Sequence, residues 1–362
     1  MSAWPCRWLV SLLLTRIKAG SLIVLEGEER RVYGSGAPAA TVRIDSPRTW
    51  RKLLGGSRGM ADAFAQGLWD SPDLLVLIRL AARNAGGLDR LRSRLAPLRW
   101  PLQRAGALVR RSTRRRRRCD VAAHYDLGNE LFALMLDPTM SYSCAVFEHD
   151  AMTLEQAQLT KLERVCEQLD LGPADRVLEI GTGWGAFALH AAATRGCHVT
   201  TTTISREQHD YAVEQVHRAG LSDRVTVLME DYRDLRGRYD KLVSIEMIEA
   251  VGWRQIGAFF AKCSELLASD GAMLLQAITI DDRAYEVEKA SRSFIKTYIF
   301  PGGCLPSLEV ITRSLARRTD MQALARSRSS ATTNASVGSG CCTSPTAKPA
   351  SRSDGSATSS CC

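Results

Sequence analysis

The chain has 362 residues, 45% of them hydrophobic and 24% charged, which is typical of a folded globular protein and excludes a disordered or fibrous one. Its length is sufficient for two domains, at roughly 150 residues for each. The formal net charge of +9 favours acidic partners, such as an anionic membrane surface or nucleic acid.

Neither a membrane span nor a signal peptide is expected. The longest apolar run, Trp8 to Leu14, is shorter than the ~20 residues that cross a bilayer. Arg16 and Lys18 follow it, and no small-residue cleavage site is present. The eleven cysteines include no CxxC pair and no zinc-like spacing, which predicts a reducing compartment and no metal site. We therefore expect a cytoplasmic protein.

Residues 1 to about 110 predict a small α+β domain. Apolar runs predict strands at 21–25, 30–33 and 41–44, with a turn at Glu26-Gly27-Glu28 between the first two. Helical spacing follows at 60–67 and at 73–82, and no catalytic cluster lies in this domain. In the second helix, the residues on one face would be Leu74, Leu77, Ile78 and Ala81.

An arginine-rich linker over 111–118 marks the domain boundary. Seven of the nine residues from 110 to 118 are arginine. Three interpretations stay open: a solvated linker, a nucleic-acid-binding arm, or a patch beside an anionic membrane, where each basic residue contributes roughly 1 kcal/mol. No interleaved aromatic residues accompany the run, so nucleic acid is not expected as a partner.

Residues 119 to about 321 predict an α/β domain, because strand and helix patterns alternate as in a parallel sheet with crossover helices. Thr153 with Gln156 forms a capping box that opens one helix. The β-branched runs resemble strands that are buried on both faces. The predicted strands are Arg176–Ile180, His198–Ile204, Val225–Met229, Leu242–Glu246 and Met273–Ile280.

A glycine-rich turn, Gly181-Thr182-Gly183-Trp184-Gly185, follows the first of these strands. Glycines let the backbone approach a ligand, and a helix starting at Ala186 would offer its N–H groups. A dinucleotide site would need G-x-G-x-x-G and an acid about 20 residues later. The turn reads G-x-G-x-G and the second strand ends without an acid, so NAD is disfavoured. A turn without a ligand stays open, whereas the acid at Glu179 favours the amino-acid end of S-adenosylmethionine.

Six ordered blocks of residues carry a family resemblance over about 180 positions. The blocks are His124–Asn129 with Leu136–Cys144, Glu179–Gly185, Thr203–Ser205 with Gln208, Asp231–Asp234, Glu246–Gly252 and Tyr298–Pro306. Together they resemble the cyclopropane-fatty-acyl-phospholipid synthase family, which includes the mycolic acid cyclopropane synthases. The resemblance extends more weakly to Ala65–Trp69 and Leu80–Asn84 in the N-terminal domain.

The resemblance implies a Rossmann-like, S-adenosylmethionine-dependent methyltransferase sheet with helices on both faces. The glycines would hold the methionine part of the cofactor, and the Tyr and Ser residues would close over it. The Thr and Gln residues would replace the ribose acid, and an Asp-Tyr pair would contact the adenine. These implied cofactor-binding residues are Tyr125, Ser143, Glu179, Gly181, Gly183, Gly185, Thr203, Gln208, Asp231 and Tyr232.

The reaction implied by the resemblance joins a cis double bond to the sulfonium methyl and then removes a proton as the ring closes. In this family a bound bicarbonate is thought to take the proton, at positions that match Cys144, Glu249, Gln276 and the backbone of Ile278. Glu249 is the sharpest candidate, because an acid after a buried strand is costly unless it is paired; a solvated loop acid stays open. Gln276 stands where many members have His, and it donates hydrogen bonds without carrying charge. Ala250, directly after Glu249, is a second departure from the family.

The resemblance ends near Met321, where members of the family continue with a catalytic tyrosine, the last strands and a helical region. Residues 322–362 contain one leucine, one valine and no aromatic residue, which predicts a disordered tail. We expect a truncated or out-of-frame C-terminus. Losing the last strands would leave 273–280 as an open, aggregation-prone sheet edge.

The sequence therefore predicts an enzyme of lipid biosynthesis that converts an unsaturated acyl chain of a phospholipid to a cyclopropane or methyl-branched chain. Its N-terminal domain would help to hold the lipid. The predicted partners are the phospholipid, an anionic membrane surface to which the protein binds peripherally, and a second copy of the chain. Two alternatives stay open: a methyltransferase of the same fold acting on a small amine, and a truncated, inactive relative that binds only cofactor or membrane.

Overall fold

The computed structural model describes residues 4–84, 128–291, 293–323, 327–328 and 359–360. Tyr125 and the arginine run therefore lie outside the described residues. Contacts divide the chain into two compact units: residues 4–84 with Ala290–Ile299, and residues 128–289 with 300–323. The segment 290–299 falls within the range predicted for the second domain, but it packs with the first unit. There the Tyr298 hydroxyl donates to Asp62, and the amide of Phe294 donates to Ser57.

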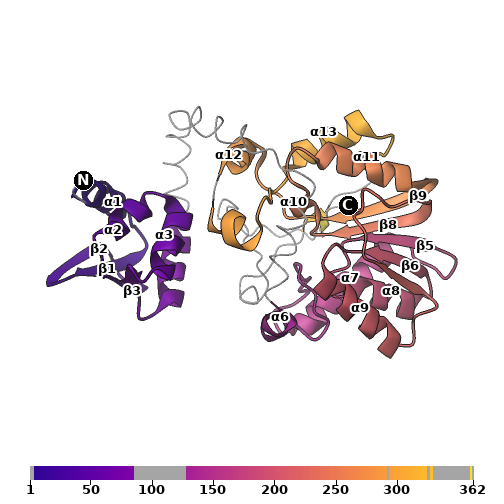
Figure 1. The fold of residues 1–362 in the computed structure, drawn as a ribbon, viewed down its shortest axis with the longest axis horizontal. Helices are drawn as coiled ribbons and strands as arrows, with labels where there is room; N and C mark the ends of the chain where they lie inside the picture. Colours follow the sequence, from indigo (N-terminus) through magenta and orange to yellow (C-terminus); the bar gives the residue numbers. More distant parts are fainter. Residues whose placement is uncertain (1–3, 85–127, 292, 324–326, 329–358, 361–362) are drawn as a thin grey trace. The chain divides into compact units, whose positions relative to one another are not determined.

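The first unit is a four-stranded sheet covered by helices (Figure 1). The strand β1 (Gly20–Glu26) pairs antiparallel with β2 (Glu29–Ser35) and parallel with β3 (Ala39–Ile44), which also pairs with β4 (Trp69–Asp70). The three predicted strands are thus confirmed. The helices of this unit are α1 (Trp4–Leu14), α2 (Arg48–Leu53), α3 (Gly56–Ala65) and one over residues 74–84. The last buries Leu77 and Leu80 and exposes Ile78, so the predicted apolar face does not coincide with the buried one.

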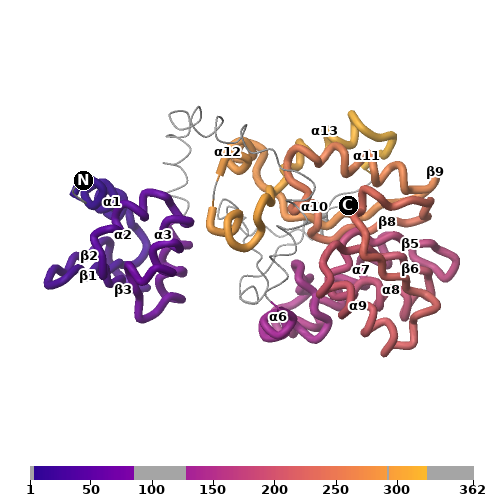
Figure 2. The backbone as a smooth tube through the Cα atoms, in the orientation of Figure 1, coloured from indigo at the N-terminus to yellow at the C-terminus, as the bar shows by residue number. Residues whose placement is uncertain are grey.

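The second unit is built on a five-stranded parallel sheet of order β7-β6-β5-β8-β9 (Figure 2). The strands are β5 (Arg176–Ile180), β6 (His198–Thr202), β7 (Val225–Leu228), β8 (Tyr239–Ile245) and β9 (Leu267–Gln276). All five predicted strands and the α/β fold class are confirmed. The strand order reverses beside β5, and in such sheets a ligand site forms at the carboxyl ends of the strands near that point.

Helices cover both faces of this sheet. On one face lie α7 (Leu154–Gln168), α8 (Ala186–Arg195) and α9 (Arg206–Arg218); on the other lie α10 (Ile248–Val251), α11 (Ile256–Leu266) and α13 (Leu308–Arg318). Successive side chains of β5 point to opposite faces of the sheet and pack in the two hydrophobic cores. Val177 packs under α7 and α8, whereas Leu178 packs under α11. Shorter elements are α6 (Asn129–Met135), η1 (Asp282–Ala284), α12 (Tyr285–Ala290) and the π-helix η2 (Ile295–Ile299).

The predicted capping box at the start of α7 is present. Thr153 Oγ1 accepts from the amide of Gln156 at 3.2 Å, and Gln156 Oε1 accepts from the amide of Thr153 at 2.9 Å. This box fixes where α7 begins and thereby sets which of its side chains face the sheet.

The predicted tail is described at few positions. Beyond residue 323 the described residues form two short antiparallel strands, β10 (Ser327–Arg328) and β11 (Ser359–Ser360); the remainder of the predicted disordered segment lies outside the described residues. Among the strands of the described sheet, β9 stands at an edge, as expected. No helix in the described part of the chain has the length and apolar content to cross a bilayer.

Candidate active site

The glycine-rich turn between β5 and α8 has a backbone that requires glycine. Gly181, Gly183 and Gly185 have φ angles of +106°, +52° and +94°, which side-chain-bearing residues rarely adopt. A Cβ on Gly181 would lie 3.1 Å from the side chain of Met247, whereas a Cβ on Gly183 would meet no atom of the described residues within 4 Å. The turn therefore presents bare backbone to open space at the start of a helix, which suits a ligand that approaches closely.

Glu179 lies just before this turn and is buried. Its Oε2 accepts from the Thr201 hydroxyl at 2.6 Å, and the hydroxyls of Thr201 and Thr182 are 2.7 Å apart. Burial raises the pKa of Glu179 to about 8, although the Thr201 hydrogen bond and Lys161 oppose the shift. A buried acid that is neutral in the absence of a positive charge can become charged when a ligand ammonium binds beside it. The ammonium of the methionine part of the cofactor is such a group.

Of the four residues expected at the ribose and adenine, Thr203 directly follows β6, Gln208 lies in the first turn of α9, and Asp231 and Tyr232 lie in the loop after β7. Thr203 and Gln208 are buried and bonded to each other, with 2.8 Å between Oγ1 and Oε1. Asp231 accepts from Arg233 Nε at 2.7 Å, and Tyr232 packs on Phe259 with 5.5 Å between ring centroids. Their positions agree with the predicted cofactor site, and their roles stay a prediction, as does that of Tyr125.

The four residues expected to hold the proton acceptor are brought together at the carboxyl ends of β8 and β9. Gln276 Nε2 donates to the carbonyl of Cys144 at 3.1 Å, and the amide of Ile278 donates to Glu249 Oε1 at 2.5 Å. Residues separated by about 130 positions thus form one cluster, as the resemblance implied.

A fifth residue, Glu246, joins this cluster and was not among the predicted catalytic residues. Its Oε1 accepts both the amide of Cys144 at 2.8 Å and Gln276 Nε2 at 2.9 Å. Its signal in the sequence was an acid directly after the apolar strand β8, the same signal that marked Glu249 three residues later.

The carboxylates of the cluster are held in a poorly solvated environment. Burial, and then the charge of Glu246, raises the pKa of Glu249 to about 8. Burial also raises the pKa of Glu246, against the hydrogen bonds from Cys144 and Gln276 and the charge of Lys161. Glu249 Oε2 is buried and has no hydrogen-bond partner among the described residues. At neutral pH Glu249 is therefore protonated and Glu246 is the better candidate for the charged form.

Two further residues, both on α7, were missed because they read as part of an ordinary amphipathic helix. Gln158 Nε2 donates to the carbonyls of Ser141 at 3.2 Å and Ser143 at 2.8 Å, and Lys161 Nζ donates to Ser143 Oγ at 2.7 Å. Burial lowers the pKa of Lys161 to about 8, and nearby carboxylates, Glu246 foremost, oppose the shift. The signal that could have revealed both residues is their position, because a glutamine and a lysine stand on the face of α7 that is otherwise apolar and buried.

The donors expected to hold a bicarbonate already have partners within the protein. The amide of Ile278 bonds Glu249, and both the amide of Cys144 and the side-chain amide of Gln276 bond Glu246. The chain's own carboxylates therefore occupy the donors expected to hold the anion. The arrangement does not fit an additional bicarbonate at these donors.

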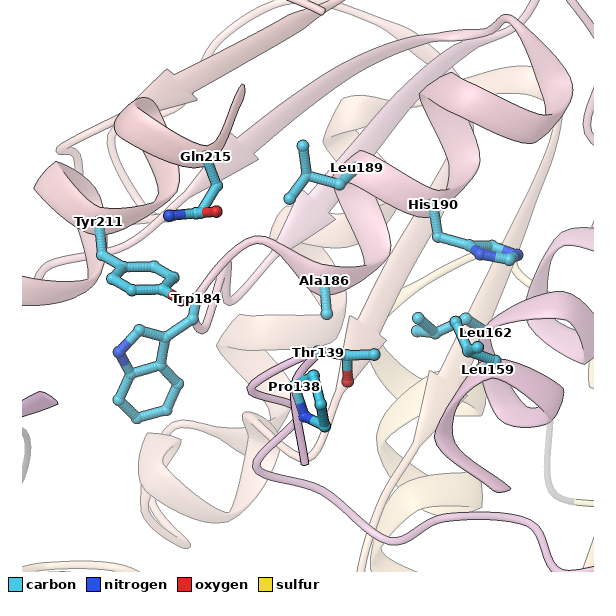
Figure 3. Close-up of a pocket in the computed structure, with 10 residues that line it drawn as sticks. All are labelled: Pro138, Thr139, Leu159, Leu162, Trp184, Ala186, Leu189, His190, Tyr211 and Gln215. Atoms are coloured by element: carbon cyan, nitrogen blue, oxygen red, sulfur yellow. The ribbon is translucent and has the colours of Figure 1, made fainter. Parts of the chain in front are cut away.

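A surface cavity of about 290 Å³ lies beside the amino end of α8 (Figure 3). Trp184, Tyr211 and Gln215 line one part of it, and His190 with Leu159 lines another. None of the predicted catalytic residues is among its lining residues. Within the described ranges, no group of three or more His, Cys, Asp or Glu side chains is arranged to hold a metal ion.

The parallel sheet with a glycine turn after its central strand β5 is the arrangement of an S-adenosylmethionine-dependent methyltransferase. Comparison with known proteins agrees. The family described as mycolic acid cyclopropane synthetase matches residues 112–329, and the chain belongs to this family.

Similar proteins and a similar crystal structure support the assignment of the chain to this family. The chain is 36% identical over 313 residues to the tuberculostearic acid methyltransferase UfaA1 of Mycobacterium tuberculosis, covering 81% of this chain and 72% of the relative. It is 38% identical over 282 residues to the cyclopropane-fatty-acyl-phospholipid synthase of Escherichia coli, covering 77% and 70%. A crystal structure of the mycolic acid cyclopropane synthase CmaA1 with SAH and CTAB is similar at a TM-score of 0.53 and 33% identity, covering 57% of this chain and 75% of that one.

Proposed function

We propose that the protein transfers a methyl(ene) group from S-adenosylmethionine to the cis double bond of an unsaturated acyl chain in a phospholipid. The product is a cyclopropane or methyl-branched fatty acid. The observation that supports this proposal is the cluster of Glu246, Glu249, Cys144 and Gln276 at the carboxyl end of the sheet. The relatives named for cyclopropane fatty acyl and tuberculostearic acid chemistry point to the same substrate class.

The chemistry of the acceptor explains why such a cluster is needed. S-adenosylmethionine supplies an electrophilic methyl group. The π electrons of the alkene form a bond to the methyl carbon as the S–CH₃ bond breaks, and the substrate becomes a carbocation. A proton bound to carbon must then leave, and its C–H electrons form the last C–C bond of the ring. A methylated amine instead loses an N–H proton, which water can accept, so a buried base favours the alkene over the amine alternative.

The substrate proposal predicts label transfer into lipid. The full chain is incubated with methyl-labelled S-adenosylmethionine and vesicles of unsaturated phospholipid. We expect label in the acyl chains and a mass gain of one CH₂ per modified chain, with fragmentation separating ring from branch. Vesicles of saturated phospholipid and small amines are the controls. Label in the amines alone would favour the amine alternative, and cofactor binding without any transfer would favour the inactive relative.

The helix α1 supports the membrane surface as a partner. It is apolar on its outer as well as its inner face: Trp4, Trp8 and Leu12 are spaced by four residues and remain 71%, 59% and 47% exposed. A helix that is apolar all round needs a cover on both sides, and tryptophan favours the interface between water and lipid. The exposed basic residues Arg16 and Lys18 follow directly and complement anionic headgroups. We propose that the protein binds the cytoplasmic face of the membrane and that it forms a homodimer.

Replacing Trp4 and Trp8 together by alanine should weaken binding to anionic vesicles by about 100-fold or more, because each ring loses apolar burial of ~1.5–3 kcal/mol. Vesicle co-sedimentation measures this. Leu134→Ala on α6 is the matched control, since Leu134 is also an exposed apolar helix residue, at 85%. Equal loss in the two variants would contradict a role specific to α1.

A further inference from the structure

Glu246 occupies an unusual place in the candidate active site. The amide of Cys144 and the side-chain amide of Gln276 converge on one of its oxygens, Oε1, at 2.8 and 2.9 Å. Two donors that converge on one point form a seat for an anion, and here a side chain of the protein fills it. Because both bonds end on Oε1, Oε2 is the oxygen that remains able to accept a proton.

The backbone of Glu246 is strained in a way that supports a function. Its φ of +48° lies in the left-handed region, which favours glycine. The residue directly follows β8, its amide donates to the carbonyl of Gln276 at 2.8 Å, and the chain then turns into α10. A glutamate in a conformation that glycine adopts more easily indicates that the carboxylate is needed at this point.

The surroundings of Glu246 favour its charged form over that of its neighbour. Lys161 is the one lysine or arginine among the buried residues of the described ranges, and Glu246 is its strongest charge partner. Glu249 Oε1 accepts from the amide of Ile278, and its buried Oε2 has no hydrogen-bond partner among the described residues, so the neutral form of Glu249 is favoured. In this cluster the negative charge therefore resides on Glu246.

We propose that the Glu246 carboxylate is the built-in base of this active site and replaces a bound bicarbonate as acceptor of the proton from the methylated substrate. The proposal rests on the proposed function. In the step, the C–H bond of the transferred methyl carbon breaks and its electron pair forms the C–C bond that closes the ring. The proton passes to Glu246 Oε2, and solvent removes it later. No external oxidant, reductant or anion is consumed.

The test uses the full chain, unsaturated phospholipid vesicles and buffer depleted of bicarbonate. We expect the unchanged protein to keep its rate within twofold on depletion. Glu246→Gly should lose about 100-fold or more, as for removal of a general base, and should regain at least tenfold when bicarbonate is added. The control is Asp170→Gly, because Asp170 has a similar φ of +50° but lies exposed beyond α7. It should match the unchanged protein. A wild-type rate that requires bicarbonate, or an undiminished Glu246→Gly rate, would overturn the proposal.

A second readout separates this proposal from the proposed function, because it needs no turnover. Isotopically labelled bicarbonate is titrated by NMR into each protein in the presence of S-adenosylhomocysteine. Glu246→Gly should bind it, since the amides of Cys144 and Gln276 are released, and the unchanged protein and Asp170→Gly should not. If the unchanged protein bound bicarbonate, the assignment of Glu246 as the base would be wrong even if methyl transfer to lipid were demonstrated. If only Glu246→Gly bound bicarbonate but no label entered lipid, the anion-binding role of the Cys144 and Gln276 amides would be supported and the proposed lipid substrate would be wrong.

Discussion

Replacing Gly183 by alanine is expected to weaken the binding of S-adenosylhomocysteine by about 100-fold, or ~3 kcal/mol, while the sheet stays folded. A Cβ at this position meets no atom within 4 Å in the described part of the chain, so it projects into the space above the turn. A cofactor lying there would have to move away from the backbone, and overpacking of this kind costs ~1–3 kcal/mol. Isothermal titration measures the affinity.

Gly220 provides a matched control for the backbone cost. It follows α9 with a φ of +67°, and a Cβ there also meets nothing within 4 Å. Alanine at either position should cost ~1–2 kcal/mol of stability because of the left-handed backbone, and the two variants should unfold alike. If Gly220→Ala lost as much affinity as Gly183→Ala, or if Gly183→Ala bound normally, the cofactor would not lie over the turn.

The predictable part of this fold is the part that repeated local patterns determine. Strands such as β5 are β-branched runs that feed two cores, so their position follows from hydrophobicity alone. The ends of the strands were predicted less accurately than their existence. The predicted strand at 242–246 begins three residues earlier, at Tyr239, and the one at 273–280 runs from Leu267 to Gln276. The ends differ because pairing with the neighbouring strand, not residue preference, decides where a ladder begins and ends.

The candidate site was predictable where residues lie in short blocks and was not where contacts join distant elements. The glycine turn is a local pattern, and Glu249 is an acid in an apolar setting. The role of Glu246 depends on donors 102 and 30 positions away, and that of Lys161 on a serine 18 positions away. Only the packing of α7 and β9 against the loop at Cys144 reveals either role. The helix α1 was missed for a related reason, since an apolar run of this length predicts no particular structure.

The pH dependence of stability should change when Glu249 is replaced by glutamine. The pKa of Glu249 is raised from 4.5 to about 8 in the folded protein, so the folded state keeps a proton that the unfolded state releases. The stabilisation from this proton is complete below pH 4.5 and is lost as the pH rises through about 8. Between pH 5.5 and 8.5 the loss is on the order of 3 kcal/mol.

Glutamine keeps the shape of the protonated acid and an acceptor for the amide of Ile278, but it has no proton to lose. Glu249→Gln should therefore be nearly as stable as the unchanged protein at pH 5.5 and clearly more stable at pH 8.5. Urea denaturation at the two pH values measures the difference. Glu265→Gln on α11, where the side chain is 64% exposed, is the control and should follow the unchanged protein. The pKa of Glu179 is also raised to about 8, and this residue remains in the variant. The dependence of stability on pH should therefore become weaker without vanishing. An identical slope in Glu249→Gln and the unchanged protein would mean that Glu249 is ionised in the folded state, and the assignment of the charge to Glu246 alone would then fail.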